Sequence, residues 1–305
     1  MQLFKSNINI MFNQLFKYGA FISIILVLCS ICIIVFKGLI PSIDFQGGTT
    51  YDVTFNQNIN LSELRSLMQT QLNQKIEIVE IQNTTQLHSN ILMKMKFIED
   101  EGEINKILIN QFGKEDFNIN QIISIGPKIG DESKTNAQYA IVLSIILIGF
   151  YVTFRFDRYY AIGSLAALMH DVLITLGIFS FFNIEISITI IAALLTIVGY
   201  SLNDTIVIYD RIRENFIKLY DSDKSMVVNR SLNETLNRTF ITSFTTLVVV
   251  IILFFYGGDV LIPFSTTLII GILIGTYSSI FIASPIMLYL ETKYPIPETN
   301  ISEDE

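Results

Sequence analysis

Six long apolar segments limit what this chain can fold into. A helix needs about 20 apolar residues to cross the hydrocarbon core of a bilayer, and each segment has roughly that length or more. The segments span residues 18–36, 137–154, 161–182, 188–209, 239–256 and 263–290. Since 51% of the residues are hydrophobic and only 16% are charged, the composition is also that of a membrane protein. We therefore predict an α-helical polytopic membrane protein with six transmembrane helices.

Apart from the long segment 37–136, the connecting segments that contain basic residues alternate with those that do not. Basic residues occur in residues 1–17, 155–160, 210–238 and 291–305. The short connections at 183–185 and 257–259 contain neither Lys nor Arg. Because connections rich in Lys and Arg stay in the cytoplasm, we expect both termini there. Residues 210–238 are then a basic cytoplasmic loop, and residues 291–305 form an acidic cytoplasmic tail.

Residues 37–136 would then lie outside the cytoplasm. Their apolar residues follow short patterns instead of long runs. Alternation predicts strands at 49–55, 75–81, 91–98 and 117–125, and helical spacing predicts helices at 61–72 and 103–112. Asn60 is a plausible N-cap of the first of these helices. The order β-α-β-β-α-β predicts one α+β ferredoxin-like (βαββαβ) extracytoplasmic domain between helices 1 and 2.

An acidic residue, Asp204, lies inside the apolar segment 188–209. A carboxylate there costs on the order of 2.5–3.5 kcal/mol even on a lenient insertion scale, so it faces a bundle interior, a wet cavity or a partner. At about 100° per residue, one broad face carries Thr196, Tyr200, Ser201, Asn203, Asp204 and Thr205. A hydrogen bond that only holds helices together would explain a lone Asp. This polar surrounding favours an ion or proton path.

Two further segments bring ionisable groups to the membrane. Arg238 stands at the start of segment 239–256, with Thr242 and Thr245 on its face. It either marks the cytoplasmic rim or turns inward and pairs with Asp204, in which case protonation of the Asp would break the pair. His170 and Asp171 lie within segment 161–182. They could relay a proton, since histidine titrates near neutral pH, or hydrogen-bond to neighbouring helices.

Small residues recur every four positions in the last segment. They are Thr267, Gly271, Gly275 and Ser279. Such a stripe lets another helix backbone approach closely, either within this chain or in a partner subunit.

Other functions have little support in the sequence. A pI of about 4.9 and the lack of a basic face argue against nucleic-acid binding. Cys29 and Cys32 lie in the first apolar segment, where two small buried residues are a simpler interpretation than a redox or metal motif. No further His or Cys stands at ligand spacing, so we expect no metal site. Hydrolase motifs are absent, and we predict that the chain is not an enzyme.

Three motifs resemble the SecF family, membrane subunits of the bacterial protein-export machinery. They are DFQGGTTYDV (residues 44–53), AALMHDVLITLG (166–177) and VGYSLNDTIVIYDRIREN (198–215), and the Arg-Thr pair at Arg238 fits as well. The third motif is highly specific. The resemblance covers nearly the whole chain, including the six spans and the outer domain.

The resemblance implies a function and a set of partners. Family members pair with a paralogous subunit, SecD, to form a twelve-span assembly similar to the resistance-nodulation-division (RND) exporters. The pair resembles a motor, driven by the proton motive force, that helps preproteins off the outer side of the SecYEG channel. YajC and YidC are further implied partners, alongside membrane lipid. The implied location is the bacterial cytoplasmic (inner) membrane.

The resemblance also assigns roles to residues. Asp204 would carry the proton and Arg238 would modulate it, with Asn203, Thr205, His170 and Asp171 in the same proton pathway. In the signature outside the first span, formed by Asp44, Gly47, Gly48 and Thr49, the two glycines permit a positive-φ backbone. Such a backbone fits either a hinge or a simple turn that leads into the first strand. No cofactor is implied beyond the coupling ion, which we expect to be H⁺, although the residues do not distinguish protons from sodium ions.

Two other functions compete with this one. The chain could be half of an RND-like exporter of small molecules or ions. It could also be a non-conducting scaffold of the export channel, although a scaffold gains little from a costly intramembrane carboxylate. An intramembrane hydrolase is a distant third.

Overall fold

The computed structural model describes most of the chain. The described residues are 10–57, 59–72, 76–81, 89–98, 101–258 and 261–294, without the side chains of residues 79–81, 101 and 103. Most of the predicted N-terminal segment, residue 259 of the short connection at 257–259, and the acidic end of the predicted tail (295–305) lie outside the described residues. The chain divides into two compact units, one formed by Met1–Ile40 with Tyr139–Glu305 and the other by Pro41–Gln138.

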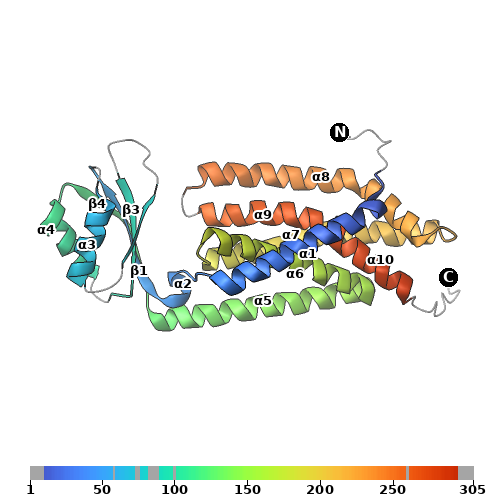
Figure 1. Ribbon diagram of the computed structural model, residues 1–305, viewed down its shortest axis with the longest axis horizontal. Helices are drawn as coiled ribbons and strands as arrows, with labels where there is room; N and C mark the ends of the chain where they lie inside the picture. Colours follow the sequence, from blue (N-terminus) through green and yellow to red (C-terminus); the bar gives the residue numbers. More distant parts are fainter. Residues whose placement is uncertain are drawn as a thin grey trace. The chain divides into compact units, whose positions relative to one another are not determined.

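The first unit is a bundle of long helices (Figure 1). It contains α1 (Phe12–Lys37), most of α5 (Pro127–Arg155), α6 (Arg158–Phe182), α7 (Ile188–Lys218), α8 (Lys224–Tyr256), α9 (Ile262–Ser278), the π-helical turn η2 (Ser279–Ala283) and α10 (Ser284–Lys293). Counting α9, η2 and α10 as one, six helices of the described chain are long and apolar enough to cross a membrane. The number of candidate spanning helices agrees with the six predicted.

Two of these helices extend into residues 210–238, the region predicted as a basic cytoplasmic loop between two spans. Residues 210–238 are helical except for a short turn, because α7 continues to Lys218 and α8 already begins at Lys224. Ion pairs at helical spacing favour the extension: Glu214 pairs with Lys218, and Arg230 pairs with Glu234. Arg211 of α7 also binds Glu234 of α8 (Nε–Oε2 2.6 Å). The Arg211–Glu234 pair therefore links α7 to α8 in the parts of these helices that lie beyond their apolar segments.

The last span is not one regular helix as predicted. It changes to a π-helical turn at η2 and resumes as α10, whose second residue is Pro285. Proline has no N–H to donate, and its ring crowds the carbonyl four residues earlier, here that of Phe281. The Ser284 hydroxyl donates to the carbonyl of Ser279 at 2.9 Å and so satisfies one backbone group of the widened turn. Pro285 is the sequence signal for this break.

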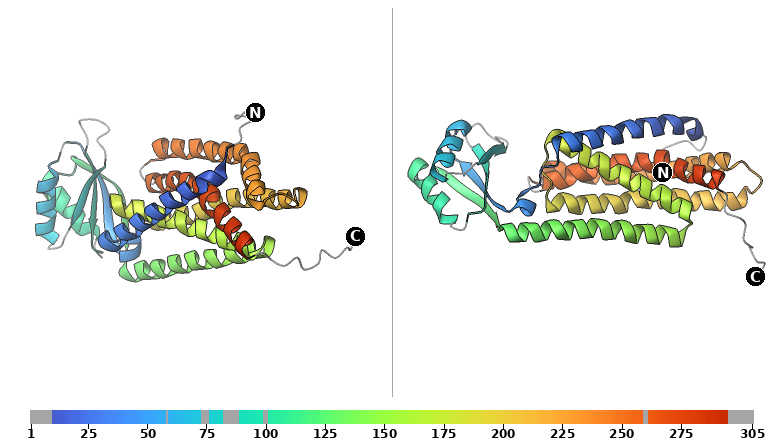
Figure 2. Two further views of the ribbon diagram at one scale, coloured as in Figure 1. Left: turned by 45° about the vertical axis from the view of Figure 1, so that its right-hand side comes forward. Right: turned by 60° about the horizontal axis from the view of Figure 1, so that its bottom comes forward.

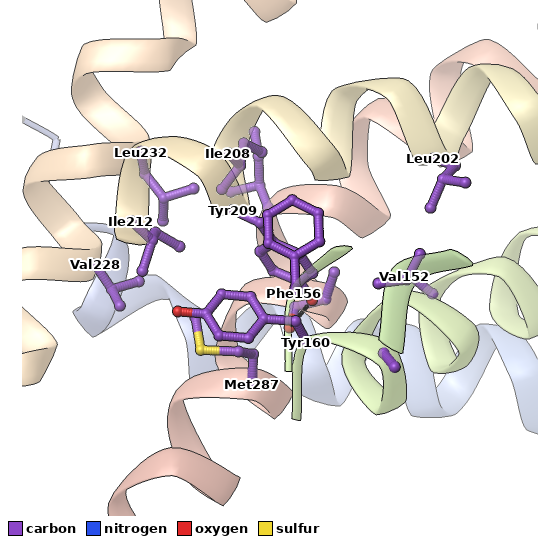
Figure 3. Packing of buried hydrophobic residues seen from close by; sticks show 14 of the residues in the cluster. Val152, Phe156, Tyr160, Leu202, Ile208, Tyr209, Ile212, Val228, Leu232 and Met287 are labelled. Carbon is purple, nitrogen blue, oxygen red and sulfur yellow. Dashed lines mark hydrogen bonds between the residues drawn. The ribbon is translucent and has the colours of Figure 1, made fainter. Parts of the chain in front are cut away.

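Aromatic side chains pack against one another where the end of α5, the start of α6 and the later part of α7 meet. Figure 3 shows Phe156, Tyr160 and Tyr209 gathered beside Met287 of α10. The Tyr160 and Tyr209 rings meet edge to face with centroids 4.9 Å apart, a favourable aromatic geometry. The Tyr209 hydroxyl donates to the Ala283 carbonyl at 3.1 Å, at the end of η2. This contact fixes α7 against the irregular part of the last span.

Helices α1 and α5 run along the outside of the bundle (Figures 1 and 2). Helix α1 contacts α6 through small residues: a Cβ on Gly177 would lie 2.4 Å from the Ser30 side chain. Cys29 and Cys32 lie on the other side of α1 and are exposed, so the prediction that they are buried is wrong. Helix α5 begins ten residues before the apolar segment, at Pro127, a residue well suited to a first helical position.

The second unit is a small antiparallel sheet with two longer helices. Its elements are α2 (Ile43–Gln46), β1 (Gly48–Phe55), α3 (Leu61–Leu72), β2 (Glu77–Ile81), β3 (Ser89–Met95), α4 (Glu101–Phe112) and β4 (Phe117–Ile125). The strand order is β2-β3-β1-β4. Apart from the short α2, the element order is the predicted β-α-β-β-α-β. Asn60 caps α3, since its side-chain oxygen accepts from the Ser62 N–H at 3.1 Å.

Alternating residues on β1 and β3 form the core of this unit. Tyr51, Val53 and Phe55 are completely buried, and Tyr51 lies opposite Met93 of β3 and Ile122 of β4. Leu64 and Met68 of α3 and Ile104 and Leu108 of α4 cover them. Strand β4 is an edge of the described sheet, and its nine residues, FNINQIISI, include no charged residue and no proline.

Candidate functional site

Helix α7 places Asp204 in the core of the bundle. Only 3% of this residue is exposed. Its carboxylate accepts a hydrogen bond from the Ser243 hydroxyl of α8 (3.2 Å), which also shares a hydrogen bond with Thr276 of α9 (2.8 Å). Three helices therefore meet at one acid whose described hydrogen-bond partner is an uncharged hydroxyl. A carboxyl group in such a setting can exist with or without its proton, since a hydroxyl can both donate and accept.

Helix α6 supplies a second buried acid. Asp171 is fully buried, and three side chains make hydrogen bonds with its two oxygens. His170 Nδ1 lies 3.0 Å from Oδ1, while the hydroxyls of Ser201 (α7) and Ser278 (α9) lie 2.7 and 2.9 Å from Oδ2. This acid thus joins the three helices α6, α7 and α9.

A hydroxyl pair separates the two acids. Thr205 of α7 and Ser279 of η2 are hydrogen-bonded at 2.8 Å, and Ser279 also contacts the Ser201 carbonyl at 3.4 Å. No described hydrogen bond connects the Asp171 group through this pair to the Asp204 group. The bundle therefore holds two acids with separate sets of partners.

The small-residue stripe of the last span allows these contacts. A Cβ on Gly271 would lie 2.1 Å from Ile197, and one on Gly275 would lie 2.9 Å from Ser201, both on α7. The backbone of α9 therefore lies directly against α7, within this chain. This close approach brings Ser278 and Ser279 within reach of Ser201 and Thr205.

Two predicted pathway residues, Asn203 and Arg238, are exposed. Among the described residues, no hydrogen bond or ion pair joins Arg238 to Asp204. The positive charge of Arg238 is nevertheless close enough to act on the Asp204 carboxylate. Thr196 is exposed as well, so the broad polar face predicted for α7 divides into a buried part (Ser201, Asp204, Thr205) and an exposed part.

Sequence reasoning missed Ser243, Thr276 and Ser278. The expected polar stripe of α8 used Thr242 and Thr245, whose hydroxyls bind the carbonyls of their own helix. The neighbouring Ser243 faces Asp204 instead. The run Thr276–Ser279, TYSS, is an unusually polar stretch of an apolar span and is the signal that could have found the other two.

The signature next to α1 forms a tight turn in the second unit. Gly47 has φ 72°, in the region that favours glycine, and Gly48 has φ 156°. A Cβ on Gly47 would lie 2.8 Å from the Cα of Pro127, and one on Gly130 would lie 2.8 Å from the Gly47 nitrogen. The Ser42 hydroxyl binds the Asp44 carboxylate at 3.1 Å. Thr49 follows in β1, and its hydroxyl pairs with Ser124 of β4 at 2.9 Å.

These features define an integral membrane protein whose helical bundle holds two buried carboxylates. Residues 105–293 match the family described as protein export membrane protein SecD/SecF, C-terminal, and residues 33–59 match the SecD/SecF GG motif. The chain is 40% identical to the protein translocase subunit SecF of Haemophilus influenzae over 275 residues, which cover 89% of this chain and 83% of that protein. It is also 40% identical to SecF of Rhodothermus marinus, with 96% of each chain covered. The chain therefore belongs to the SecF family of protein translocase subunits.

Solved structures agree with this assignment. A crystal structure of SecDF, a translocon-associated membrane protein from Thermus thermophilus, matches with a TM-score of 0.83 and 35% identity. A structure of SecDF in a super-membrane-facing form matches with a TM-score of 0.70 and 36% identity. In both cases 96% of this chain is covered, but the chain spans only 40% of the length of that protein.

Proposed function

We propose that this chain is a subunit of the bacterial Sec protein-export machinery that acts with SecD as a motor driven by the proton motive force. The observation that supports the proposed motor function is the buried carboxylate of Asp204, which is hydrogen-bonded to the Ser243 hydroxyl. Intramembrane acids cost free energy and usually mark ion or proton pathways. Family membership supports the export role.

Asp204 would carry the proton in this motor. An ionised carboxylate in the apolar bundle is unfavourable, so gain or loss of a proton changes which packing of α7, α8 and α9 is preferred. Moving one charge through the membrane potential supplies about 2.3 kcal/mol per 100 mV. A few protons can therefore drive a conformational step of several kcal/mol. Thr205, His170 and Asp171 belong to the same proposed pathway, and sodium is the alternative coupling ion.

A SecD partner would complete the bundle. Asn203 is an exposed amide in the apolar part of α7 and has no hydrogen-bond partner among the described residues. Facing lipid, such an amide is costly, whereas a neighbouring helix can bond to it. Arg238 lies exposed near the start of the apolar part of α8, where it would reach the proton pathway from the partner's side. The greater length of the SecDF chains leaves room for this partner.

The second unit offers another surface for the partner. Strand β4 is a long edge without the charges or prolines that commonly protect such edges, and unprotected edges pair readily with another strand. Its strand order and element order fit a ferredoxin-like domain, which we place outside the cytoplasm, with both termini inside. There it would contact preproteins leaving SecYEG, with YajC and YidC as further partners in the inner membrane.

Replacing Asn203 with leucine should weaken the complex. Interhelical hydrogen bonds in membranes contribute on the order of 0.6–2 kcal/mol, so we expect roughly a 3- to 30-fold loss of co-purified SecD-like partner at limiting concentration. Thr196→Val is the matched control, because Thr196 is also exposed on α7 but already bonds to its own helix at Ala192. Equal recovery of the partner with Asn203→Leu would show that the amide does not lie at the interface.

Export in a depleted strain tests the proposed function. The chain and its SecD-like partner are expressed together in a bacterium depleted of its own pair, and secretion of a signal-bearing preprotein is followed by pulse labelling. We expect restored secretion that collapses when the membrane potential and pH gradient are dissipated after ATP-dependent insertion. Secretion that is insensitive to dissipation would favour the scaffold. Drug resistance without restored secretion would favour a small-molecule exporter.

A further inference from the structure

The imidazole of His170 carries one of the buried side-chain atoms of the described bundle that have no hydrogen-bond partner. The residue is only 5% exposed, and its Nε2 atom has no hydrogen-bond partner among the described residues. Tyr277 stacks on the imidazole, with ring centroids 6.2 Å apart. Its hydroxyl is already hydrogen-bonded, since it donates to the Gly19 carbonyl (2.7 Å) and accepts from Ser23 (3.0 Å). A buried polar atom without a hydrogen-bond partner is rare in folded proteins and needs an explanation.

The partners of Asp171 indicate which ring nitrogen carries a hydrogen. Ser201 and Ser278 both donate to Oδ2, so this carboxyl group is surrounded by donors. A carboxylate that accepts several hydrogen bonds is stabilised in its ionised form. Ionised Asp171 requires a hydrogen on His170 Nδ1, which leaves the Nε2 lone pair of a neutral ring free.

We propose that His170 Nε2 is a second proton-binding site of the bundle, whose hydrogen-bond partners differ from those of Asp204, and that Asp171 holds the charge that stabilises the imidazolium. This inference rests on the proposed function only for its link to transport. The step is a simple protonation: a proton adds to the Nε2 lone pair, and the neutral ring with ionised Asp171 becomes a buried ion pair. No bond within the protein breaks.

The surroundings of the ring contain few other titratable groups. On its own helix, α6, it faces Asp171, and α9 contributes Tyr277. Helix α1 contributes the Ser23 hydroxyl, with Lys17 and Lys37 only near its ends. Asp204 on α7 faces Ser243, and Glu291 on α10 pairs with Lys224. The charge of the ring is therefore governed chiefly by Asp171.

The position of the site suggests what protonation does. Ser278 is the last residue of α9, and the π-helical turn η2 starts at the next residue. A charged ring draws Asp171 toward itself and competes with the two hydroxyls that connect α6 to α7 and α9. Because π-helical turns are local irregularities often found at functional sites, the junction of α9 and η2 is suited to respond.

Nitrogen NMR tests the proposal directly, because the chain has only two histidines, His88 and His170. In the full chain carrying His88→Gln, labelled with ¹⁵N-histidine and placed in lipid nanodiscs, every histidine signal comes from His170. At about pH 8 we expect a neutral ring with its hydrogen on Nδ1. At about pH 5 we expect Nε2 to have gained a proton. A neutral ring with hydrogen on Nε2, or no change over this range, would overturn the proposal.

Two variants separate the proton site from its role in transport. Adding Asp171→Asn to the His88→Gln chain should lower the ratio of charged to neutral ring about tenfold or more at a fixed pH, because the opposite charge is lost. An unchanged ratio would contradict the role of Asp171. His170→Asn keeps a donor near the Nδ1 position but cannot titrate, so the pH profile of export by this variant should differ from that of the parent, in which Asp204 and His170 both exchange protons. If the parent's pH profile persists, the link to transport is wrong even where NMR shows protonation.

Discussion

Replacing Asp204 with asparagine should abolish export while the chain stays folded and bound to its partner. Asparagine has nearly the same shape as aspartate, and its side-chain oxygen can still accept from Ser243, which donates to Asp204 at 3.2 Å. Removing a costly buried acid should not reduce the stability of the bundle. What is lost is the ability to take up and release a proton.

The measurement is preprotein secretion together with proton flux in vesicles that contain the chain and its SecD-like partner. We expect both to fall to background, at least about a hundredfold for a residue that carries the transported ion. Ser243→Ala is the matched control, because it removes the hydroxyl and leaves the carboxylate. Losing one hydrogen bond costs about 1 kcal/mol, so this variant should retain measurable export. Secretion at the parent's rate by Asp204→Asn, with the complex intact, would make the acid structural and favour the scaffold.

The helices of this chain were predictable because the bilayer imposes a simple rule. Each spanning helix needs about 20 apolar residues in a row, and that pattern can be read without knowing any contact. The exceptions have identifiable causes. The extension of α7 and α8 through residues 210–238 is accompanied by ion pairs such as Arg211–Glu234, which form only when the two helices lie side by side. The break before Pro285 was readable, since a proline in the interior of an apolar span disrupts the helix before it.

The candidate site was predictable only in part. The sequence singled out Asp204 and the His170–Asp171 pair because ionisable groups stand out in apolar segments. It did not show which side of each helix is buried. Asn203 and Asp204 are neighbours in sequence, yet one is exposed and the other buried. That difference depends on how α9 packs against α7 through Gly271 and Gly275, a tertiary contact that periodicity does not determine.

The same limit explains the missed hydroxyls. Serine and threonine in a membrane helix usually bond to the carbonyl four residues earlier, as Thr242 and Thr245 do. One hydroxyl of the same run of α8, that of Ser243, instead reaches an acid on another helix, and the sequence does not distinguish it from its neighbours. The acids were therefore visible in the sequence, whereas this partner required the fold.

Replacing Gly47 with alanine should destabilise the unit formed by Pro41–Gln138 strongly. Its φ of 72° costs a residue with a Cβ about 1–2 kcal/mol. The new Cβ would also lie 2.8 Å from the Cα of Pro127, and overpacking of this kind costs about 1–3 kcal/mol. We expect a total of about 2–5 kcal/mol. Pulse proteolysis of the full chain in detergent, with cleavage sites mapped to this unit, measures the loss.

Three other glycines of the chain separate the two costs. A Cβ on Gly126 would have open space around it at ordinary φ, so Gly126→Ala should have little effect or stabilise slightly. Gly113, in the same unit, has φ 88°, and only the end of the Asp116 side chain lies near its Cβ position, at 3.3 Å, so its alanine variant reports mainly strain. Gly130 is the reverse case, with a close contact to the Gly47 nitrogen and no positive φ. If the cost at Gly47 exceeds that at each of Gly113 and Gly130, the turn is a fixed, closely packed entry to β1. If Gly47→Ala leaves stability unchanged but stops export, the turn must yield during the working cycle, and the hinge becomes the better explanation of the paired glycines.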